Sequence, residues 1–238
     1  MEKENNIDKG KKENVRNMFN NIAGKYDFLN HFLSMNIDHL WRRKVVKILS
    51  KHKHENILDV ATGTADLAIA AIKLHPTSIT GIDISDEMLK IGREKLINKK
   101  LDALIKLQTA DSENIPFDND SFDACMVAFG VRNFEDLNKG LSEMYRVIKP
   151  DGVVVILEFS KPKSFPVKQI YGFYFKNILP VLGKMISKDN FAYTYLPDSV
   201  SKFPEGNDFV ITLKTIGFKE LKRIPLTFGI ATIYYGIK

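Results

Sequence analysis

The sequence predicts an α/β protein built on a doubly wound, mostly parallel sheet of seven strands. Short apolar segments alternate along the chain with segments of helical periodicity, as such a fold requires. A turn of small residues, Thr62–Ala65, follows the first apolar segment, and Asp83 lies near the end of the second. The carboxyl ends of parallel strands open into one crevice, so the turn and the carboxylate are expected to share a binding site.

The strands are predicted from short runs that are apolar enough to be buried on both faces of a sheet. Two further segments near the end of the chain are expected to form an antiparallel hairpin at one edge of the sheet. The predicted strands are residues 55–62, 78–85, 105–111, 121–129 and 152–159, followed by the hairpin of 219–226 and 231–238.

Helices are predicted between these strands. One spans Thr64 to Leu74, and a second begins after Ser85, which has the short polar side chain of a helix cap. A third spans Glu135 to Ile148 with apolar residues on one face, and Lys149–Gly152 is expected to stop it. A fourth lies near residues 206–216.

The length of 238 residues favours one domain with additions. We expect a flexible leader at residues 1–12 and a single domain at 13–238. Within this domain, residues 13–50 are expected to form a helical cap. The aromatic-rich segment 164–204 interrupts the alternation of strands and helices and is expected to form an inserted helical lid.

Composition excludes several classes of protein. The net charge is +6, but the basic residues are scattered, which disfavours a nucleic-acid partner. The single cysteine, Cys125, lies in an apolar strand, so neither an internal disulfide nor a nucleophile is expected. The five histidines have no accompanying ligand set, so no metal is expected. No apolar signal region or membrane-spanning run is visible, which favours a cytoplasmic location.

The turn around Gly63 separates two classes of nucleoside cofactor. A dinucleotide site normally has the pattern G-x-G-x-x-G, in which backbone N–H groups approach the pyrophosphate. Only Gly63 is present here, flanked by Thr62, Thr64 and Ala65. Such a turn suits a cation without phosphates, such as S-adenosylmethionine, better than a pyrophosphate. A glycine that merely joins strand to helix is the alternative.

Several longer motifs resemble those of the ubiquinone/menaquinone-biosynthesis C-methyltransferases. The resemblance covers nearly the whole chain beyond the first dozen residues, and Phe129–Asn133 and Glu158–Pro162 are its most specific parts. The motifs are residues 19–27, 59–67, 111–117, 118–123, 129–133, 145–150 and 157–162. The resemblance implies a class I S-adenosylmethionine-dependent methyltransferase fold, which is Rossmann-like, and methylation of a ring carbon of a prenylated quinol. The sequence of residues Gly63–Asp66 resembles that of the menaquinone-pathway enzymes of this family more closely than that of the ubiquinone-pathway enzymes.

The resemblance also implies roles for individual residues. Gly63 and Thr64 would belong to the cofactor turn, and Asp83 would bind the ribose hydroxyls. Asp111 and Ser112 would lie beside the adenine. A threonine hydroxyl can hold the methionine carboxylate, and a carboxylate can accept from hydroxyl or amino groups. The alternatives are helix capping for Thr64 and Ser112, and a strand-end turn for Asp83.

Arg132 is the candidate catalytic residue because it follows the fourth strand at the carboxyl edge of the predicted sheet. A guanidinium there can stabilise a phenolate, which makes the neighbouring ring carbon a better nucleophile. An ion pair with Asp136 or Glu135 is the alternative role. Some relatives have a cofactor-contacting serine where this chain has Ala128, so no contact is assigned to that position.

The leading function is therefore C-methylation of 2-demethylmenaquinol to menaquinol. Methylation of a ubiquinone-pathway 2-polyprenyl-6-methoxy-1,4-benzoquinol is the closest alternative. A nicotinamide-dependent oxidoreductase and a noncatalytic cofactor-binding subunit are more distant ones. The expected partners are a prenylated quinol and, transiently, the inner face of a membrane, with a second copy of the chain as an open alternative.

Overall fold

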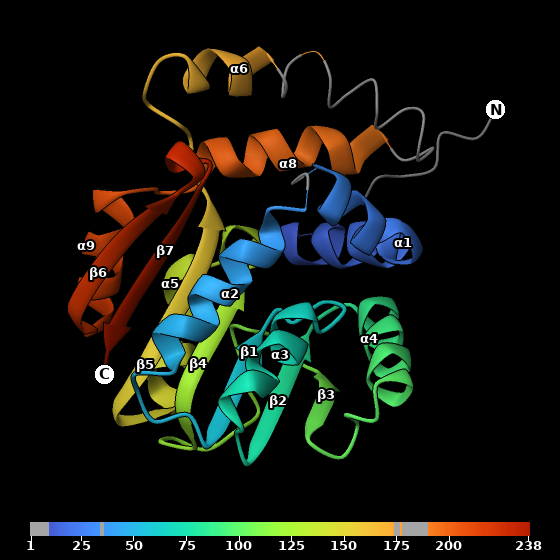
Figure 1. Cartoon of the computed structure of the whole chain (residues 1–238), viewed down its shortest axis with the longest axis vertical. Coiled ribbons are helices and arrows are strands. Elements are labelled where there is room, and N and C mark those ends of the chain that lie inside the picture. Colours follow the sequence, from blue (N-terminus) through green and yellow to red (C-terminus); the bar gives the residue numbers. More distant parts are fainter. Residues whose placement is uncertain (1–9, 34–35, 174–176, 178–189) are drawn as a thin grey trace.

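A single mixed sheet forms the centre of the protein, whose computed structural model describes residues 10–33, 36–173, 177 and 190–238 (Figure 1). Its seven strands have the order β3-β2-β1-β4-β5-β7-β6. β7 is antiparallel to both neighbours, and the remaining pairs are parallel. The strands are β1 (Asn56–Val60), β2 (Ser78–Asp83), β3 (Ile105–Thr109), β4 (Phe122–Ala128), β5 (Ile148–Phe159), β6 (Lys219–Leu226) and β7 (Ala231–Ile237). The predicted doubly wound sheet and its terminal hairpin are confirmed.

Helices cover both faces of this sheet, and α1 and α8 lie beyond the arrowheads of the parallel strands (Figure 1). Short 3₁₀ turns at Ile72–Leu74, Val131–Asn133 and Thr227–Gly229 join some of the elements. The described helices are α1 (Lys11–Leu33), α2 (Asp38–Leu49), α3 (Asp66–Ala71), α4 (Asp86–Asn98), α5 (Leu137–Val147), α6 (Val167–Phe173), α8 (Asn190–Lys202) and α9 (Asn207–Ile216).

The core consists of two apolar layers, one on each face of the sheet. Successive side chains of a strand point to opposite faces, so neighbours on β4 belong to different layers. Met126 packs in the layer that contains Leu49 of α2. Cys125 packs in the layer that contains Leu141 of α5. Cys125 is fully buried, as expected for a core residue.

The N-terminal helices are joined to the end of the chain through Trp41 of α2. Its indole N–H donates to the Thr227 hydroxyl at 2.8 Å. The Trp41 ring also packs against Phe129 and Phe159, with centroid distances of 6.0 and 6.2 Å. These contacts hold α2 across the carboxyl ends of β4 and β5.

Several predicted element boundaries differ from the structure by one or more residues, and two of these differences have a clear structural cause. α3 begins at Asp66 rather than Thr64, because Gly63 and Ala65 have left-handed backbones with φ of 55° and 67°. β5 begins at Ile148 rather than 152, because Ile148 already pairs with Phe122 before a bulge in the strand. The third predicted helix therefore ends one residue before Ile148.

The two flanking segments are described in part. α1 begins at Lys11, inside the segment 1–12 expected as a leader, while residues 1–9 lie outside the described residues. α6 and α8 lie within the segment 164–204 that was expected as a lid. Residues 174–176 and 178–189 of that segment are also outside the described residues. Among the described helices, none is long and apolar enough to cross a membrane.

Candidate active site

The candidate site lies at the carboxyl edge of the parallel strands, where the chain turns sharply after β1. Thr62 donates through its hydroxyl to Asp59 at 2.6 Å, and the Ala65 N–H donates to the Thr62 carbonyl at 3.0 Å. The left-handed backbone at Gly63 is easily adopted by glycine, which has no Cβ. The turn therefore lies close against the ends of β1 and β2, with its small side chains packed there.

Asp83 at the end of β2 fixes this turn. One carboxylate oxygen accepts from the Gly63 N–H at 2.8 Å, and the other accepts from the Ser85 N–H at 2.9 Å. Burial raises the pKa of Asp83, and these backbone donors oppose that shift. Each carboxylate oxygen can accept a second hydrogen bond, so Asp83 can hold ligand hydroxyls while it keeps the turn in place.

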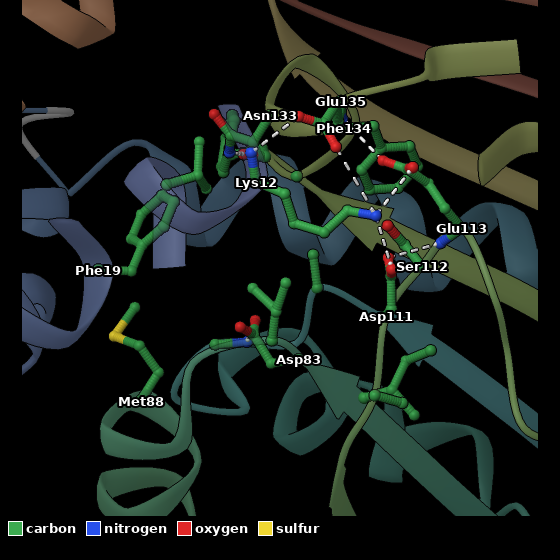
Figure 2. Close-up of a pocket in the computed structure, with 18 of the residues that line it drawn as sticks. Lys12, Phe19, Asp83, Met88, Asp111, Ser112, Glu113, Asn133, Phe134 and Glu135 are labelled. Carbon is green, nitrogen blue, oxygen red and sulfur yellow. Dashed lines mark hydrogen bonds and ion pairs between the residues drawn. The ribbon is translucent and has the colours of Figure 1, made fainter. Parts of the chain in front are cut away.

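A pocket opens above Asp83, which we call the strand-end pocket (Figure 2). Its walls come from α1, from the ends of β1, β2 and β4, and from the segment after β3. Phe19 and Met88 lie on one side of Asp83, and Asp111 and Ser112 lie on the other (Figure 2). The structure therefore brings Gly63, Asp83, Asp111 and Ser112 to one cavity.

Lys12 of α1 reaches across this pocket to the wall that contains Asp111 (Figure 2). Its ammonium lies 2.7 Å from an Asp111 oxygen and 3.0 Å from a Glu113 oxygen. Glu113 is buried and also accepts from the Glu135 and Asp136 N–H groups at 2.8 and 3.1 Å. Sequence reasoning missed Lys12 and Glu113, because 99 residues separate Lys12 from Asp111 and no local pattern connects them.

A second, smaller pocket adjoins the first, which we call the turn pocket. The two pockets share Tyr26, Ala61, Gly63 and Ala128. Its remaining lining residues are Arg42, Asp59, Thr62, Thr64, Asp66 and Leu67. The cavity at the carboxyl edge is thus elongated, with Gly63 at the junction of its two parts.

The turn pocket contains buried groups of both signs. Thr64 lines it, and the Thr64 hydroxyl oxygen accepts from the Lys95 ammonium at 2.9 Å. Burial raises the pKa of Asp59 from 3.8 to about 7, although the Thr62 hydroxyl and the Arg42 guanidinium oppose the shift. Burial likewise raises the pKa of Tyr26 to about 12, so its phenol is neutral at physiological pH.

Arg132 lies on the 3₁₀ turn after β4 but does not line either of these pockets. Its guanidinium forms a 2.9 Å ion pair with Glu158 at the end of β5, and the two side chains are 7% and 0% exposed. The alternative role considered from the sequence, an ion pair of Arg132 with Asp136 or Glu135, therefore has the wrong partner. Arg132 also donates to the Phe129 carbonyl and to the Ser199 hydroxyl of α8, the latter at 3.3 Å.

A third pocket lies on the far side of Arg132, between the start of α5 and α8. It is lined by Lys11, Arg132, Tyr195, Ser199 and Lys202, among others. Phe134 and Glu135 line both this pocket and the strand-end pocket. Arg132 is thus close to the site without facing the carboxylates that the sequence assigned to the cofactor.

Glu158 was missed by the sequence analysis, although one signal was available. It is the single acidic residue at the end of the apolar run Val153–Leu157. Burial raises the pKa of Glu158, and the Arg132 charge opposes this shift. An isolated carboxylate in a buried strand normally needs a cation, and Arg132 lies at the end of the neighbouring strand.

In the part of the chain that the structure describes, no group of three or more His, Cys, Asp or Glu side chains could hold a metal ion.

Comparisons with known proteins agree with this architecture. The model of the ubiE/COQ5 methyltransferase family matches residues 7–238. A demethylmenaquinone methyltransferase of Bacteroides fragilis is 48% identical over 229 residues, covering 96% of this chain and 94% of the relative. The ubiquinone/menaquinone biosynthesis C-methyltransferase UbiE of Geotalea daltonii is 50% identical over 230 residues, covering 96% and 97%.

A solved structure shows the same fold. A SAM-dependent methyltransferase of Thermotoga maritima superimposes with a TM-score of 0.66 at 19% identity, covering 93% of this chain and 99% of that one. The sheet order, the cavity at its carboxyl edge and the full-length match together establish that this chain belongs to the ubiE/COQ5 methyltransferase family.

Proposed function

We propose that this protein transfers the methyl group of S-adenosylmethionine to a ring carbon of 2-demethylmenaquinol, giving menaquinol. The observation that carries the proposal is the elongated cavity at the carboxyl edge, where Asp83 and Asp111 line one part and the Gly63 turn leads to the other. The relative from Bacteroides fragilis, named demethylmenaquinone methyltransferase, supports the choice of substrate.

The cofactor would lie along this cavity. Asp83 would accept from the ribose hydroxyls, and Asp111 and Ser112 would contact the adenine in the strand-end pocket. Gly63 would shape the turn beside the ligand, because its left-handed backbone, with φ of 55°, is easily adopted by glycine. Thr64 would contact the methionine end in the turn pocket, which it lines.

The bound cofactor supplies a methyl group already activated by its sulfonium, so the protein has to align the ring carbon and exclude water. Phe19, Met88 and Phe134 give the strand-end pocket apolar walls that would enclose the adenosine part of the cofactor and exclude water from it. We assign Arg132, which lines the third pocket and neither of the two that would hold the cofactor, to stabilising a quinol oxygen placed in that third pocket as it loses its proton. The negative charge on this oxygen raises the electron density on the adjacent ring carbon. The ring proton leaves after the methyl group is attached.

A ubiquinone-pathway 2-polyprenyl-6-methoxy-1,4-benzoquinol is the second candidate substrate. The specific observation in its favour is the 50% identity to the Geotalea daltonii relative, whose name covers both pathways. Both substrates present a reduced ring with a prenyl chain, so one site can serve both.

We also propose that the protein touches a membrane surface transiently, at the inner face and from the cytoplasm. The support is a patch around α6, which has no buried residue. Phe165, Ile170 and Phe173 are 81%, 64% and 61% exposed, and Lys163 and Lys168 lie exposed beside them. Apolar side chains flanked by lysines suit the headgroup region of an anionic bilayer, and the hydrocarbon interior beneath it would hold the prenyl chain of the quinol.

Vesicle co-sedimentation tests this membrane contact. Ile170→Ser with Phe173→Ser should weaken binding to vesicles that contain anionic lipid, and added salt should weaken it further. Ile211→Ser is the matched control, because Ile211 is 61% exposed on α9, away from this patch. Equal binding by all three proteins would remove α6 from the contact.

The reaction is tested with radiolabelled S-adenosylmethionine and chemically reduced demethylmenaquinone in detergent. Label on the ring carbon supports the proposal, and oxidised quinone should accept none. Competition with the benzoquinol measures the second activity. Cofactor binding without transfer to either quinol would overturn the proposed substrate class while leaving the family unchanged.

A further inference from the structure

Arg42 of α2 is a buried cation that the proposed roles leave unused. Its side chain is 6% exposed and lines the turn pocket, next to the Gly63 turn. The Arg42 Nε is buried and has no hydrogen-bond partner among the described residues. A buried donor without a partner costs stability, so its presence calls for an explanation.

The contacts that Arg42 does make explain only part of its burial. One terminal nitrogen donates to Asp38, four residues earlier on the same helix. The other lies 3.7 Å from Asp66 at the start of α3, which is beyond hydrogen-bond distance. The guanidinium therefore forms its shortest contact within its own helix. Beyond that helix it has a loose ion pair with Asp66 and a cation–π contact with the Phe129 ring, 5.9 Å from the ring centroid.

The charges around Arg42 match a ligand that carries both signs. Asp59 and Asp66 line the same pocket as Arg42, and Asp66 also pairs with the Lys95 ammonium at 2.7 Å, so carboxylates and cations lie together around a single small cavity. A simple anion would be repelled by the carboxylates, and a simple cation would be repelled by the guanidinium. An α-amino acid group satisfies both, because its carboxylate and its ammonium are separated by one carbon.

We propose that Arg42 binds the α-carboxylate of the methionine end of S-adenosylmethionine, with Asp59 and Asp66 facing the α-ammonium. This inference rests on the proposed cofactor and extends the turn pocket's role beyond Thr64. Arg42 becomes a positioning residue: by fixing the far end of the cofactor it sets where the sulfonium lies along the cavity. A planar guanidinium with an unused donor is well suited to hold a carboxylate.

The experiment compares two ligands that differ only in the carboxylate: S-adenosylhomocysteine and its decarboxylated analogue, 5′-(3-aminopropylthio)-5′-deoxyadenosine. Affinities are measured calorimetrically with the full chain. The wild-type protein should prefer S-adenosylhomocysteine about 10- to 100-fold, as expected for a charge-assisted hydrogen bond. Arg42→Gln should reduce that preference to about 2-fold or less, by weakening S-adenosylhomocysteine while leaving the analogue unchanged or tighter.

The matched control is Arg43→Gln, because Arg43 is the next residue of α2 and is exposed. It should keep the full preference. Arg42→Lys retains the charge but not the fork of donors, and should give an intermediate preference; it carries the test if Arg42→Gln does not fold. Equal weakening of both ligands in the Arg42 variants would overturn the proposal, since it indicates that Arg42 only packs α2.

The same data separate this inference from the proposed function. A wild-type protein that binds both ligands with equal affinity refutes the carboxylate contact and leaves the cofactor intact. A wild-type protein that binds neither ligand refutes the cofactor itself.

Discussion

The ion pair between Arg132 and Glu158 allows the structural role of Arg132 to be separated from its proposed catalytic role by mutation. The two side chains lie 2.9 Å apart and are 7% and 0% exposed. Replacing Arg132 by Met leaves the Glu158 carboxylate buried without its cation. The double change Arg132→Met with Glu158→Gln removes both charges and keeps an amide oxygen that can accept from the Phe159 N–H.

The loss of stability follows from this burial. Removing one partner of a buried ion pair costs about 3–5 kcal/mol. A chain of 238 residues has an unfolding entropy of about 0.5 kcal/mol/K, so Arg132→Met should lower the Tm by about 6–10 °C. The raised pKa of Glu158 allows it to take up a proton, so this loss should shrink as the pH is lowered. The double variant should recover at least half of it.

Turnover supplies the second measurement. If Arg132 stabilises the quinol oxygen, both variants should lose about 100- to 1,000-fold in kcat, while the affinity for S-adenosylhomocysteine changes less than 3-fold. The control is Lys238→Met, because the Lys238–Asp120 pair is similarly short at 2.7 Å but the carboxylate left behind is 49% exposed. It should cost no more than about 1 kcal/mol. Recovery of kcat together with Tm in the double variant would refute a catalytic role.

Three further changes test the charges of the cavity. Asp59→Asn should remove a pH dependence of stability. The native pKa of Asp59, about 7, exceeds the unfolded value of 3.8, so the folded wild type binds more protons than the unfolded chain. Thermal unfolding should therefore show the wild type losing stability relative to the variant as the pH rises from 4 to 7. A slope of opposite sign would contradict this. Asp83→Asn should weaken S-adenosylhomocysteine binding about 10- to 100-fold in calorimetry, because the NH₂ group of the new amide would face another donor such as the Gly63 N–H. Unchanged affinity would exclude Asp83 from the site. Lys12→Met should accelerate S-adenosylhomocysteine release about 2- to 5-fold in stopped-flow measurements, because α1 loses its ion pair with Asp111. Slower release would mean that Lys12 competes with the ligand for Asp111.

The strands were predictable because buried strands consist mainly of apolar residues. Residues 124–128 of β4 and 153–157 of β5 are continuously apolar, and burial on both faces of a sheet requires that composition. The start of α3 was not predictable at the same level. Ala65 adopts a left-handed backbone that alanine rarely has, and only the hydrogen bonds of the turn around Gly63 favour it there.

The candidate site was predictable where one strand end determines the position of a residue. Asp83 and Asp111 follow β2 and β3, so the parallel topology alone brings them to the same edge. Arg42 and Lys12 come from helices that precede the sheet, and their contacts depend on how those helices pack. Nothing local in the sequence encodes that packing, so both cations were missed.

The contact between Trp41 and Thr227 has a consequence for biosynthesis. The two residues are separated by 186 positions, and the ribosome adds about 5–20 residues per second. Thr227, the hydrogen-bond partner of Trp41, is therefore synthesised roughly 10–40 s after Trp41. During that interval the apolar side of α2 has no completed sheet to cover it, so we expect it to be accessible to chaperones until the end of the chain has been synthesised.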